Sequence, residues 1–348
     1  MKLGNFFIFK ILILLVMPLA NASYVEYPYN EGEYVELFQE LDNVAPTRPS
    51  GIPFTRAVMK YGKAVVKEGK IIASSDIKPW SSWWYPTHDR QIFEESDEGE
   101  ISTLQRYDQY AKKIKPNSGS SRDFEEDEVY DPQSGGWAGL CHAWALASIM
   151  EDEPTKEVVK NGIKFRIQDL KALLLKSYEG SYPKETYGQR NNANWDSVYE
   201  DIYPEQFHTI LNAELFEKKR PFLMDFDAGF QVWNVPVYRA KVIVEKDPDN
   251  SSVVHVNTFL TVATPYVNDP NYVGTTTLTF SYKYDLYGSW EAPDRFVVDY
   301  GIWVKRGMID SRRNHPDFIV VKPDSIKRRT KNEFIDIALV DEILKGSR

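Results

Sequence analysis

The sequence contains a single cysteine, Cys141, in 348 residues. A chain with one cysteine forms no internal disulfide, so a disulfide-stapled fold is excluded. Basic residues are also in deficit, because 42 lysines and arginines stand against 51 aspartates and glutamates and leave a net charge of −9. Nucleic acids are bound mainly through clustered basic side chains, so this charge argues against nucleic acid as a partner.

Long hydrophobic runs are absent apart from one near the N-terminus, Ile11–Ala20. The run follows a lysine, contains Pro18, and leads into an Ala-Asn-Ala sequence that ends at Ala22. It is shorter than the roughly 20 residues that a membrane-spanning helix needs. These features are typical of a secretory signal peptide over residues 1–22, cleaved before Ser23. We therefore expect a secreted or periplasmic protein with no stable membrane anchor.

The rest of the chain is rich enough in apolar residues to bury a sizeable core, since 42% of the sequence is hydrophobic and 14% is aromatic. Changes in composition predict three regions. We expect an N-terminal arm and helical region over residues 23–120, placed to cover a cleft. A catalytic domain follows over residues 121–325, and a C-terminal helix and tail over residues 326–348.

Helical patterns precede strand patterns along the chain, which predicts an α+β fold with an antiparallel sheet. The predicted helices are Leu104–Ile114, Cys141–Met150, Ile167–Lys176 and a last one within Lys331–Leu344. The predicted strands, rich in Val, Thr, Tyr and Phe, are Phe222–Phe226, Gln231–Val244, His255–Val262, Thr275–Asp285 and Phe296–Val304. Weak alternation over residues 59–75 indicates a small hairpin.

Cys141 stands where a glycine-rich loop meets the predicted helix Cys141–Met150. A free cysteine is most often a small buried hydrophobe. At a helix N-terminus, however, free backbone N–H groups and the helix dipole favour a thiolate, which is the reactive form. The sequence leaves both interpretations open, an inert thiol and a nucleophile.

A nucleophilic cysteine needs a base and a group that orients the base. His208, followed by Asp225 after the apolar run Pro-Phe-Leu-Met, supplies one such pair. His255 and Asp285, both in strand-forming segments, supply an alternative pair. His142 is adjacent to Cys141, and neighbours along a helix point in different directions, so it is a poor partner.

Other residues near the cysteine and the first long strand are candidates for binding. The Trp137 indole N–H is a second oxyanion donor beside the backbone N–H of Cys141, although Trp137 serves equally well as a hydrophobic wall. Trp233 and Asn234 either line a substrate groove or hold the edge of a strand. The acidic runs at residues 94–98 and 122–131 lack the ligand spacing of a calcium loop, so no metal site is predicted.

The segment Gly-Leu-Cys-His-Ala-Trp-Ala at 139–145 and the segment Gln-Val-Trp-Asn-Val-Pro-Val-Tyr-Arg-Ala-Lys-Val at 231–242 resemble the transglutaminase elicitor family. Val235 stands where the family has glutamine. Shorter matches in the same order lie at 81–86, 207–208, 221–225 and 314–318. The likeness therefore extends over most of the chain, from about residue 75 to 320.

The resemblance implies a papain- or transglutaminase-like core whose cysteine helix packs on an antiparallel sheet. It also implies a protein-glutamine γ-glutamyltransferase, in which Cys141 attacks a glutamine carboxamide and a lysine amine resolves the thioester. The order of thiol, histidine and aspartate in transglutaminases supports His208 and Asp225. The expected partners are proteins with exposed glutamine and lysine. No cofactor is predicted, and calcium stays open because many eukaryotic transglutaminases require it.

Other functions compete with transglutamination. A glutamine deamidase uses the same thioester but transfers it to water. A papain-like cysteine peptidase cleaves a backbone amide instead, but the glutamine that such enzymes keep shortly before the cysteine is missing here, where Gly135 precedes Cys141 by six residues. A secreted surface or elicitor-like binding protein would need an inert Cys141.

Overall fold

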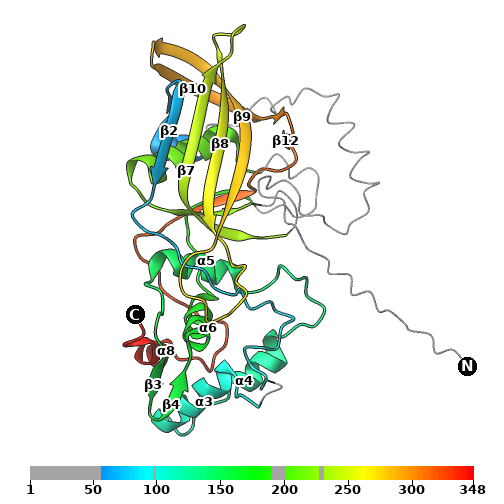
Figure 1. The fold of residues 1–348 in the computed structure, drawn as a ribbon, viewed down its shortest axis with the longest axis vertical. Coiled ribbons are helices and arrows are strands. Elements are labelled where there is room, and N and C mark those ends of the chain that lie inside the picture. Colours follow the sequence, from blue (N-terminus) through cyan, green and yellow to red (C-terminus); the bar gives the residue numbers. More distant parts are fainter. Residues whose placement is uncertain (1–55, 97–98, 190–200, 227–230) are drawn as a thin grey trace, which may run out of the picture.

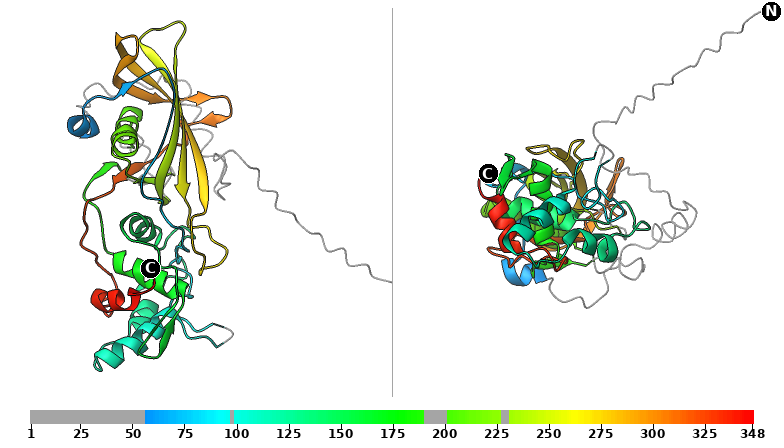
Figure 2. Two further views of the ribbon diagram at one scale, coloured as in Figure 1. Left: turned by 60° about the vertical axis from the view of Figure 1, so that its left-hand side comes forward. Right: turned by 90° about the horizontal axis from the view of Figure 1, so that it is seen from below.

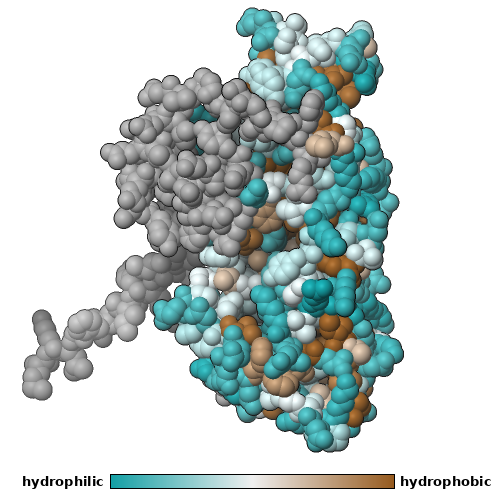
Figure 3. Space-filling model, turned by 180° about the vertical axis from the view of Figure 1, so that it is seen from behind, coloured by the Kyte–Doolittle hydropathy of each residue, from teal (hydrophilic) through white to brown (hydrophobic). Residues whose placement is uncertain are grey.

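A computed structural model describes residues 56–96, 99–189, 201–226 and 231–348. The predicted signal peptide and the predicted arm up to residue 55 lie outside these ranges. The described chain is elongated, with a β-sheet at one end and most of the helices at the other (Figure 1). Hydrophobic and hydrophilic residues are interspersed over the face seen in Figure 3. None of the helices within the described ranges is long and apolar enough to cross a membrane.

Antiparallel pairing joins nine strands of the described chain into one sheet, in the order β1-β10-β9-β8-β7-β6-β13-β5, with β2 also on β7. The strands are β1 Val65–Val66, β2 Gly69–Ser74, β5 Thr186–Gly188, β6 Phe222–Asp225, β7 Asn234–Lys246, β8 Val253–Ala263, β9 Thr277–Ala292, β10 Arg295–Trp303 and β13 Phe318–Val321. Buried and less buried residues alternate along β8 and β9, because successive side chains of a strand point to opposite faces. The five strands predicted from the sequence are all present.

The hairpin predicted within residues 59–75 does not form. Both short strands are there, but β1 pairs with β10 and β2 pairs with β7. Each segment gains more by completing an edge of the large sheet than by pairing with the other, since an isolated two-stranded hairpin is marginally stable in water. The short link between β1 and β2 therefore connects the outer edges of β7 and β10, and the sheet curls.

Helices cover one face of the sheet (Figure 2). They are α2 Arg56–Tyr61, α7 Pro204–Ile210 and the π-helical segment η3 Leu211–Glu217. The ring of Phe207 on α7 packs edge-to-face on Tyr282, Tyr284 and Trp303 of the sheet. Large aromatic side chains bury the most apolar area, so this cluster anchors α7. A small hairpin of β11 Lys305–Arg306 and β12 Ile309–Asp310 follows β10.

The other end of the molecule is mainly helical. It contains α3 Thr103–Ile114, α4 Ser121–Phe124, the π-helical segment η1 Glu125–Val129, α5 Cys141–Met150, α6 Ile167–Tyr178, α8 Ile337–Leu344 and the hairpin of β3 Val158–Lys160 and β4 Ile163–Phe165. The helices predicted at Leu104, Cys141 and Ile167 are present within two residues at each end. The predicted C-terminal helix is shorter and begins where the Asp336 side chain accepts a hydrogen bond from the N–H of Ala338.

Helix α5 lies where the helical end meets the sheet (Figure 1). Its sequence is apolar almost all round, which is typical of a helix buried on every side. It contacts α6 in the helical part and β7 in the sheet. The first residue of α5, Cys141, is consequently at the junction of the two parts.

Helix α5 is fixed in place by residues 80–86, here called the aromatic loop. The Trp144 indole donates to the Trp80 carbonyl oxygen, and the Trp80 indole donates to the Glu151 carbonyl oxygen, each at 2.9 Å. The N–H of Leu140 donates to the Trp84 carbonyl oxygen at 2.7 Å. Buried indole N–H groups need such partners, so the loop and the helix hold each other.

Gly139 is the closest approach of the two segments. A Cβ atom at Gly139 would lie 2.7 Å from the Tyr85 carbonyl oxygen and 2.9 Å from that of Trp84. Gly139→Ala is therefore expected to lower the free energy of unfolding by about 1–3 kcal/mol, as overpacking does. Urea unfolding measures this. Gly136→Ala is the matched control, since its Cβ would have no atom closer than 3.9 Å; equal effects of the two substitutions would contradict the packing described.

Candidate active site

Cys141 is buried, with 4% of its surface exposed. Its thiol donates a long hydrogen bond of 3.6 Å to the Val232 carbonyl oxygen. It also lines a cavity of about 330 Å³ whose walls are mostly apolar. The other lining residues are Trp137, Gly139, His142, Leu146, Ser181, Tyr182, Pro183, Thr186, Leu223, Val232, Asn234, Phe318 and Val320. The sulfur thus faces a space large enough for more than one side chain.

Groups around the thiol shift its pKa in opposite directions. Burial raises the pKa of Cys141 to about 11, the backbone N–H of Asn234 lowers it, the charge of Asp225 raises it, and the N–H groups of His142 and Cys141 itself lower it. Burial and the Asp225 carboxylate together raise the thiol pKa by more than the backbone N–H groups lower it. Cys141 is therefore a neutral thiol at pH 7, and the thiolate expected from its place on the helix is not the resting form.

Asp225 is held near the thiol by the pairing of β6 with the start of β7. It ends β6 and lies opposite Asn234, the first residue of β7. Its Oδ1 accepts a hydrogen bond of 2.9 Å from the N–H of Trp233, and the residue is fully buried. The Val-Trp-Asn sequence at 232–234 therefore contacts both groups, because Val232 accepts from the thiol and Trp233 donates to the carboxylate.

Aromatic rings form one side of this region. The rings of Trp84, Trp233 and Tyr266 lie 5.7–5.9 Å from one another, centroid to centroid. Burial, and after it the charge of Cys141, raises the pKa of Tyr266 to about 12. This charge effect indicates that Tyr266 lies near the thiol. Trp137 lines the cavity on which Cys141 opens. Trp84 and Tyr266 were not singled out in the sequence, although Trp84 is part of the segment at 81–86.

The structure does not bring His208 to this group. Its Nδ1 is 2.8 Å from the Tyr284 hydroxyl, which is 2.9 Å from the Thr258 hydroxyl. Thr258 pairs with Val242 on β7, eight steps beyond Asn234. At a strand rise of about 3.3 Å per residue, this is roughly 26 Å along β7. His208 is fully buried, and burial lowers its pKa to about 4.

His255 and Asp285 are brought to each other but not to Cys141. His255 Nδ1 lies 2.7 Å from Asp285 Oδ1, and His255 Nε2 lies 3.0 Å from Asp247 Oδ2. His255 is opposite Glu245 on β7, farther still from Asn234 than Val242 is. This cluster therefore belongs to the end of the sheet remote from α5.

His142 is the histidine nearest in the fold to Cys141 among those described. It lines the cavity together with the thiol, and its Nε2 is 2.8 Å from the Glu179 carbonyl oxygen. Its ring stacks on Tyr182 with an angle of 1° between the planes. Burial lowers the pKa of His142, so the ring is neutral at pH 7. From the sequence, His142 is a poor partner for Cys141 because neighbouring side chains of a helix point in different directions. In the first turn of α5, however, both neighbours line the same cavity.

Metal ligands do not gather in the parts of the chain that the structure describes. No group of three or more His, Cys, Asp or Glu side chains there could hold a metal ion. The described residues around Cys141 offer one carboxylate and one thiol, which are fewer hard oxygen ligands than calcium takes.

Comparison with known proteins relates the chain to transglutaminases. The model of the transglutaminase elicitor family matches residues 133–289, which include Cys141, Asp225 and the 231–242 segment. The structure is similar to the crystal structure of the GP42 transglutaminase from Phytophthora sojae, with a TM-score of 0.61 and 21% identity over 86% of this chain and 98% of that chain. No curated protein matches the sequence.

The mixed helical and antiparallel-sheet fold is therefore that of a transglutaminase-related protein. The resemblance of the sequence to the transglutaminase elicitor family, first seen at 139–145 and 231–242, is confirmed.

The raised pKa of Cys141 predicts slow thiol chemistry in the free protein. At pH 8 a thiol of pKa about 11 is ionised about 100-fold less than an unperturbed one. Iodoacetamide should therefore alkylate native Cys141 at least about 100-fold more slowly than the urea-unfolded chain, with a rate that still climbs above pH 9. A rate that levels off near pH 7 would contradict the neutral resting thiol.

The lowered pKa of His208 predicts loss of stability in acid. The folded protein keeps His208 neutral down to about pH 4, whereas the unfolded chain binds a proton near pH 6.5. The stabilisation is thus complete above pH 6.5 and falls, by about 3 kcal/mol, as the pH drops to 4. Urea unfolding of His208→Gln at both pH values should lack this part of the loss.

The same variant tests the distance between His208 and the thiol. Glutamine retains a hydrogen-bonding group for Tyr284, so the fold should survive. Because the two residues lie far apart along β7, the alkylation rate of Cys141 should be unchanged in His208→Gln. A tenfold change in that rate would show that His208 acts on the thiol.

Proposed function

We propose that the protein is a protein-glutamine γ-glutamyltransferase with Cys141 as the nucleophile. The observation that carries the proposal is the placement of the Cys141 sulfur on a cavity of about 330 Å³, with the backbone N–H of Asn234 and the charge of Asp225 both acting on it. The match to the transglutaminase elicitor family supports it. In this proposal, α5 against β7 is the counterpart of the cysteine helix and sheet of papain- and transglutaminase-like enzymes.

The first step forms a thioester. The sulfur bonds to the carboxamide carbon of a glutamine side chain, and the thiol proton moves to the Asp225 carboxylate. Because the resting thiol is neutral, this transfer accompanies the attack rather than preceding it. In this proposal, backbone N–H groups of the Cys141 turn and the Trp137 indole stabilise the oxyanion. The proton on Asp225 then goes to the departing nitrogen, which leaves as ammonia.

The second step transfers the acyl group. A lysine amine bonds to the thioester carbon, the carbon–sulfur bond breaks, and a proton of the amine returns to the sulfur by way of Asp225. An isopeptide bond and the free thiol result. If water takes the place of the amine, the product is glutamate, and the enzyme is a deamidase.

Asp225 is the base in this proposal because it is the carboxylate whose charge reaches the thiol. His208 and His255, the histidines favoured by the sequence, take no part in the steps above, since each is bonded to sheet residues far along β7. Trp233 positions Asp225 through its N–H, and Asn234 lines the donor cavity.

The donor cavity favours a particular kind of glutamine. Its lining contains Leu146, Leu223, Phe318 and Val320, and none of the described lining residues is an aspartate, glutamate, lysine or arginine. A charged neighbour of the reactive glutamine would lose its hydration there without gaining a partner. Protein glutamines flanked by apolar residues are thus the proposed substrates, met outside the cell after removal of residues 1–22.

Mass spectrometry of a glutamine-containing protein incubated with a primary amine tests the proposal. Wild-type protein should add amine with loss of ammonia, and Cys141→Ala should add none. Asp225→Asn should lower the rate by about 10²–10⁴, as loss of a general base does. Asp299→Asn, which changes an exposed carboxylate of the sheet, is the control and should match the wild type.

Any other outcome with the wild-type protein contradicts transglutamination by this site. A gain of one dalton without amine indicates deamidation, and backbone fragments indicate a peptidase. Unmodified substrate with wild-type protein indicates a binding protein. The experiment is run with and without calcium, and the thermal unfolding of each variant is compared so that a misfolded variant is not mistaken for an inactive one.

A further inference from the structure

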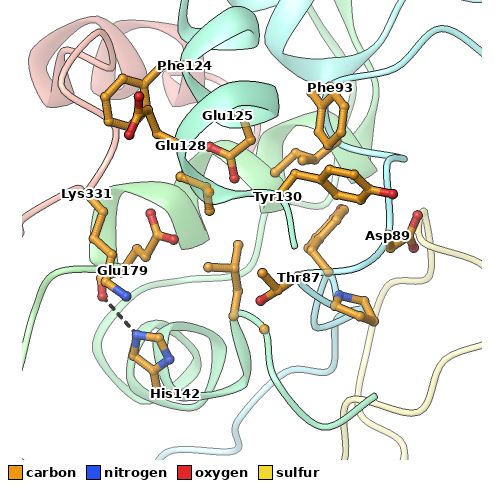
Figure 4. A pocket seen from close by; sticks show the side chains of 16 residues that line it. Thr87, Asp89, Phe93, Phe124, Glu125, Glu128, Tyr130, His142, Glu179 and Lys331 are labelled. Atoms are coloured by element: carbon orange, nitrogen blue, oxygen red, sulfur yellow. Dashed lines mark hydrogen bonds between the residues drawn. The ribbon is translucent and has the colours of Figure 1, made fainter. Parts of the chain in front are cut away.

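A second cavity, of about 390 Å³, lies beside the start of α5 (Figure 4). Its walls come from the aromatic loop and the residues after it, from α4 and η1, from the end of α6, and from the C-terminal segment. The charged lining residues are Asp89, Glu125, Glu128, Glu179 and Lys331, and the large aromatic ones are Tyr85, Phe93, Phe124 and Tyr130. None of these residues has a part in the steps proposed above.

The charges around this cavity do not cancel. Glu125 and Glu179 are buried and share one buried ammonium, Lys176, at 2.8 Å and 2.6 Å. The remaining partner of Glu125 is the neutral amide of Asn332 at 3.0 Å. Buried charges are normally paired, so two carboxylates on one ammonium leave a negative charge that a cation would neutralise.

The mouth of the cavity adds further carboxylates. Asp89 and Glu128 line it, against the single ammonium of Lys331, which is exposed. Ring faces contribute as well, because aromatic rings attract cations. The guanidinium of Arg90 already lies 5.2 Å from the ring centre of Tyr130 and 5.8 Å from that of Phe93. Carboxylates and ring faces together therefore favour an organic cation.

This cavity adjoins the thiol cavity. Gly139 and His142 line both. The His142 ring bonds to the Glu179 carbonyl oxygen on the side of the second cavity (Figure 4) and stacks on Tyr182, which lines the first. The ring is thus the partition between the two spaces. Turning the ring would break one hydrogen bond and one ring stack.

We propose that the second cavity binds the acyl acceptor, the alkylammonium group of a lysine side chain. The proposal rests on the proposed function, because an acceptor site has a use only if Cys141 forms a thioester. The bound ammonium gives one proton to a lining carboxylate and passes His142 as a neutral amine. Its nitrogen then bonds to the thioester carbon as the carbon–sulfur bond breaks, and a proton of the amine passes to the sulfur by way of Asp225. The lining carboxylate releases the proton it took to solvent.

Equilibrium binding tests the site without any catalysis. n-Butylammonium is titrated into the full-length Cys141→Ala protein by calorimetry at low salt, with 1-butanol as the uncharged control. We expect the ammonium to bind and the alcohol not to bind. Asp89→Asn and Glu128→Gln should each weaken binding about three- to tenfold, the size of one partly screened charge pair. Lys331→Gln should strengthen binding by a similar factor.

Asp127→Asn is the matched control for Glu128→Gln. Asp127 is the exposed neighbour on η1 and does not line the cavity, so its substitution should leave binding within twofold. Equal weakening of butylammonium binding by Asp127→Asn and Glu128→Gln would show that only the net charge of the protein matters, and would overturn the site. Absence of butylammonium binding, or equal binding of 1-butanol, would overturn it as well.

Kinetics separate this site from the thiol chemistry. With wild-type Cys141, Glu128→Gln should raise the KM for cadaverine about three- to tenfold with little change in kcat. The control Asp127→Asn should leave the KM for cadaverine and the ammonia release in the absence of amine unchanged. A fall in kcat of Glu128→Gln with no change in its KM for cadaverine would overturn the acceptor role. If no variant releases ammonia while butylammonium still binds as described, the proposed function fails and the cation site stands.

Discussion

Burial of the first turn of α5 is the constraint on which the rest of the arrangement depends. The aromatic loop, the indoles of Trp80 and Trp144 and the missing side chain of Gly139 all serve to hold that turn against the start of β7. Burial gives Cys141 a fixed position but also raises its pKa, so the same contacts that place the thiol keep it protonated. In the proposed mechanism the Asp225 carboxylate takes the thiol proton at the moment of attack, a step that a preformed thiolate would not need.

The long strands divide the molecule into two chemical zones. The start of β7 belongs to the thiol, Asp225 and the Val-Trp-Asn sequence. The opposite end carries the ion cluster of His255, Asp285 and Asp247. His208 lies between them, bonded within the sheet. A histidine and an aspartate in suitable order along the chain therefore do not imply a triad, because strand register decides which residues share a level.

Much of the fold follows from the sequence, for particular physical reasons. Residues 141–150 are apolar throughout and 277–292 alternate, and both patterns depend on local geometry alone, so the helix and the strand are present as expected. The position of Cys141 at a helix N-terminus is predictable for the same reason, because a glycine-rich loop directly precedes the apolar helix. The pairing of β1 with β10 and β2 with β7, the level of His208, and the two cavities around His142 depend on long-range packing, which no local pattern encodes.

The contact between Cys141 and Val232 joins residues that are 91 positions apart. As the chain emerges in order, from a ribosome or through a membrane, the thiol appears long before the carbonyl group that covers it. Until residue 232 has also emerged, the sulfur cannot be fully buried, even if α5 and the aromatic loop have already packed together. The lone thiol thus passes through a period of exposure whose length is set by the speed of chain delivery, in a protein that has no second cysteine with which it could pair wrongly.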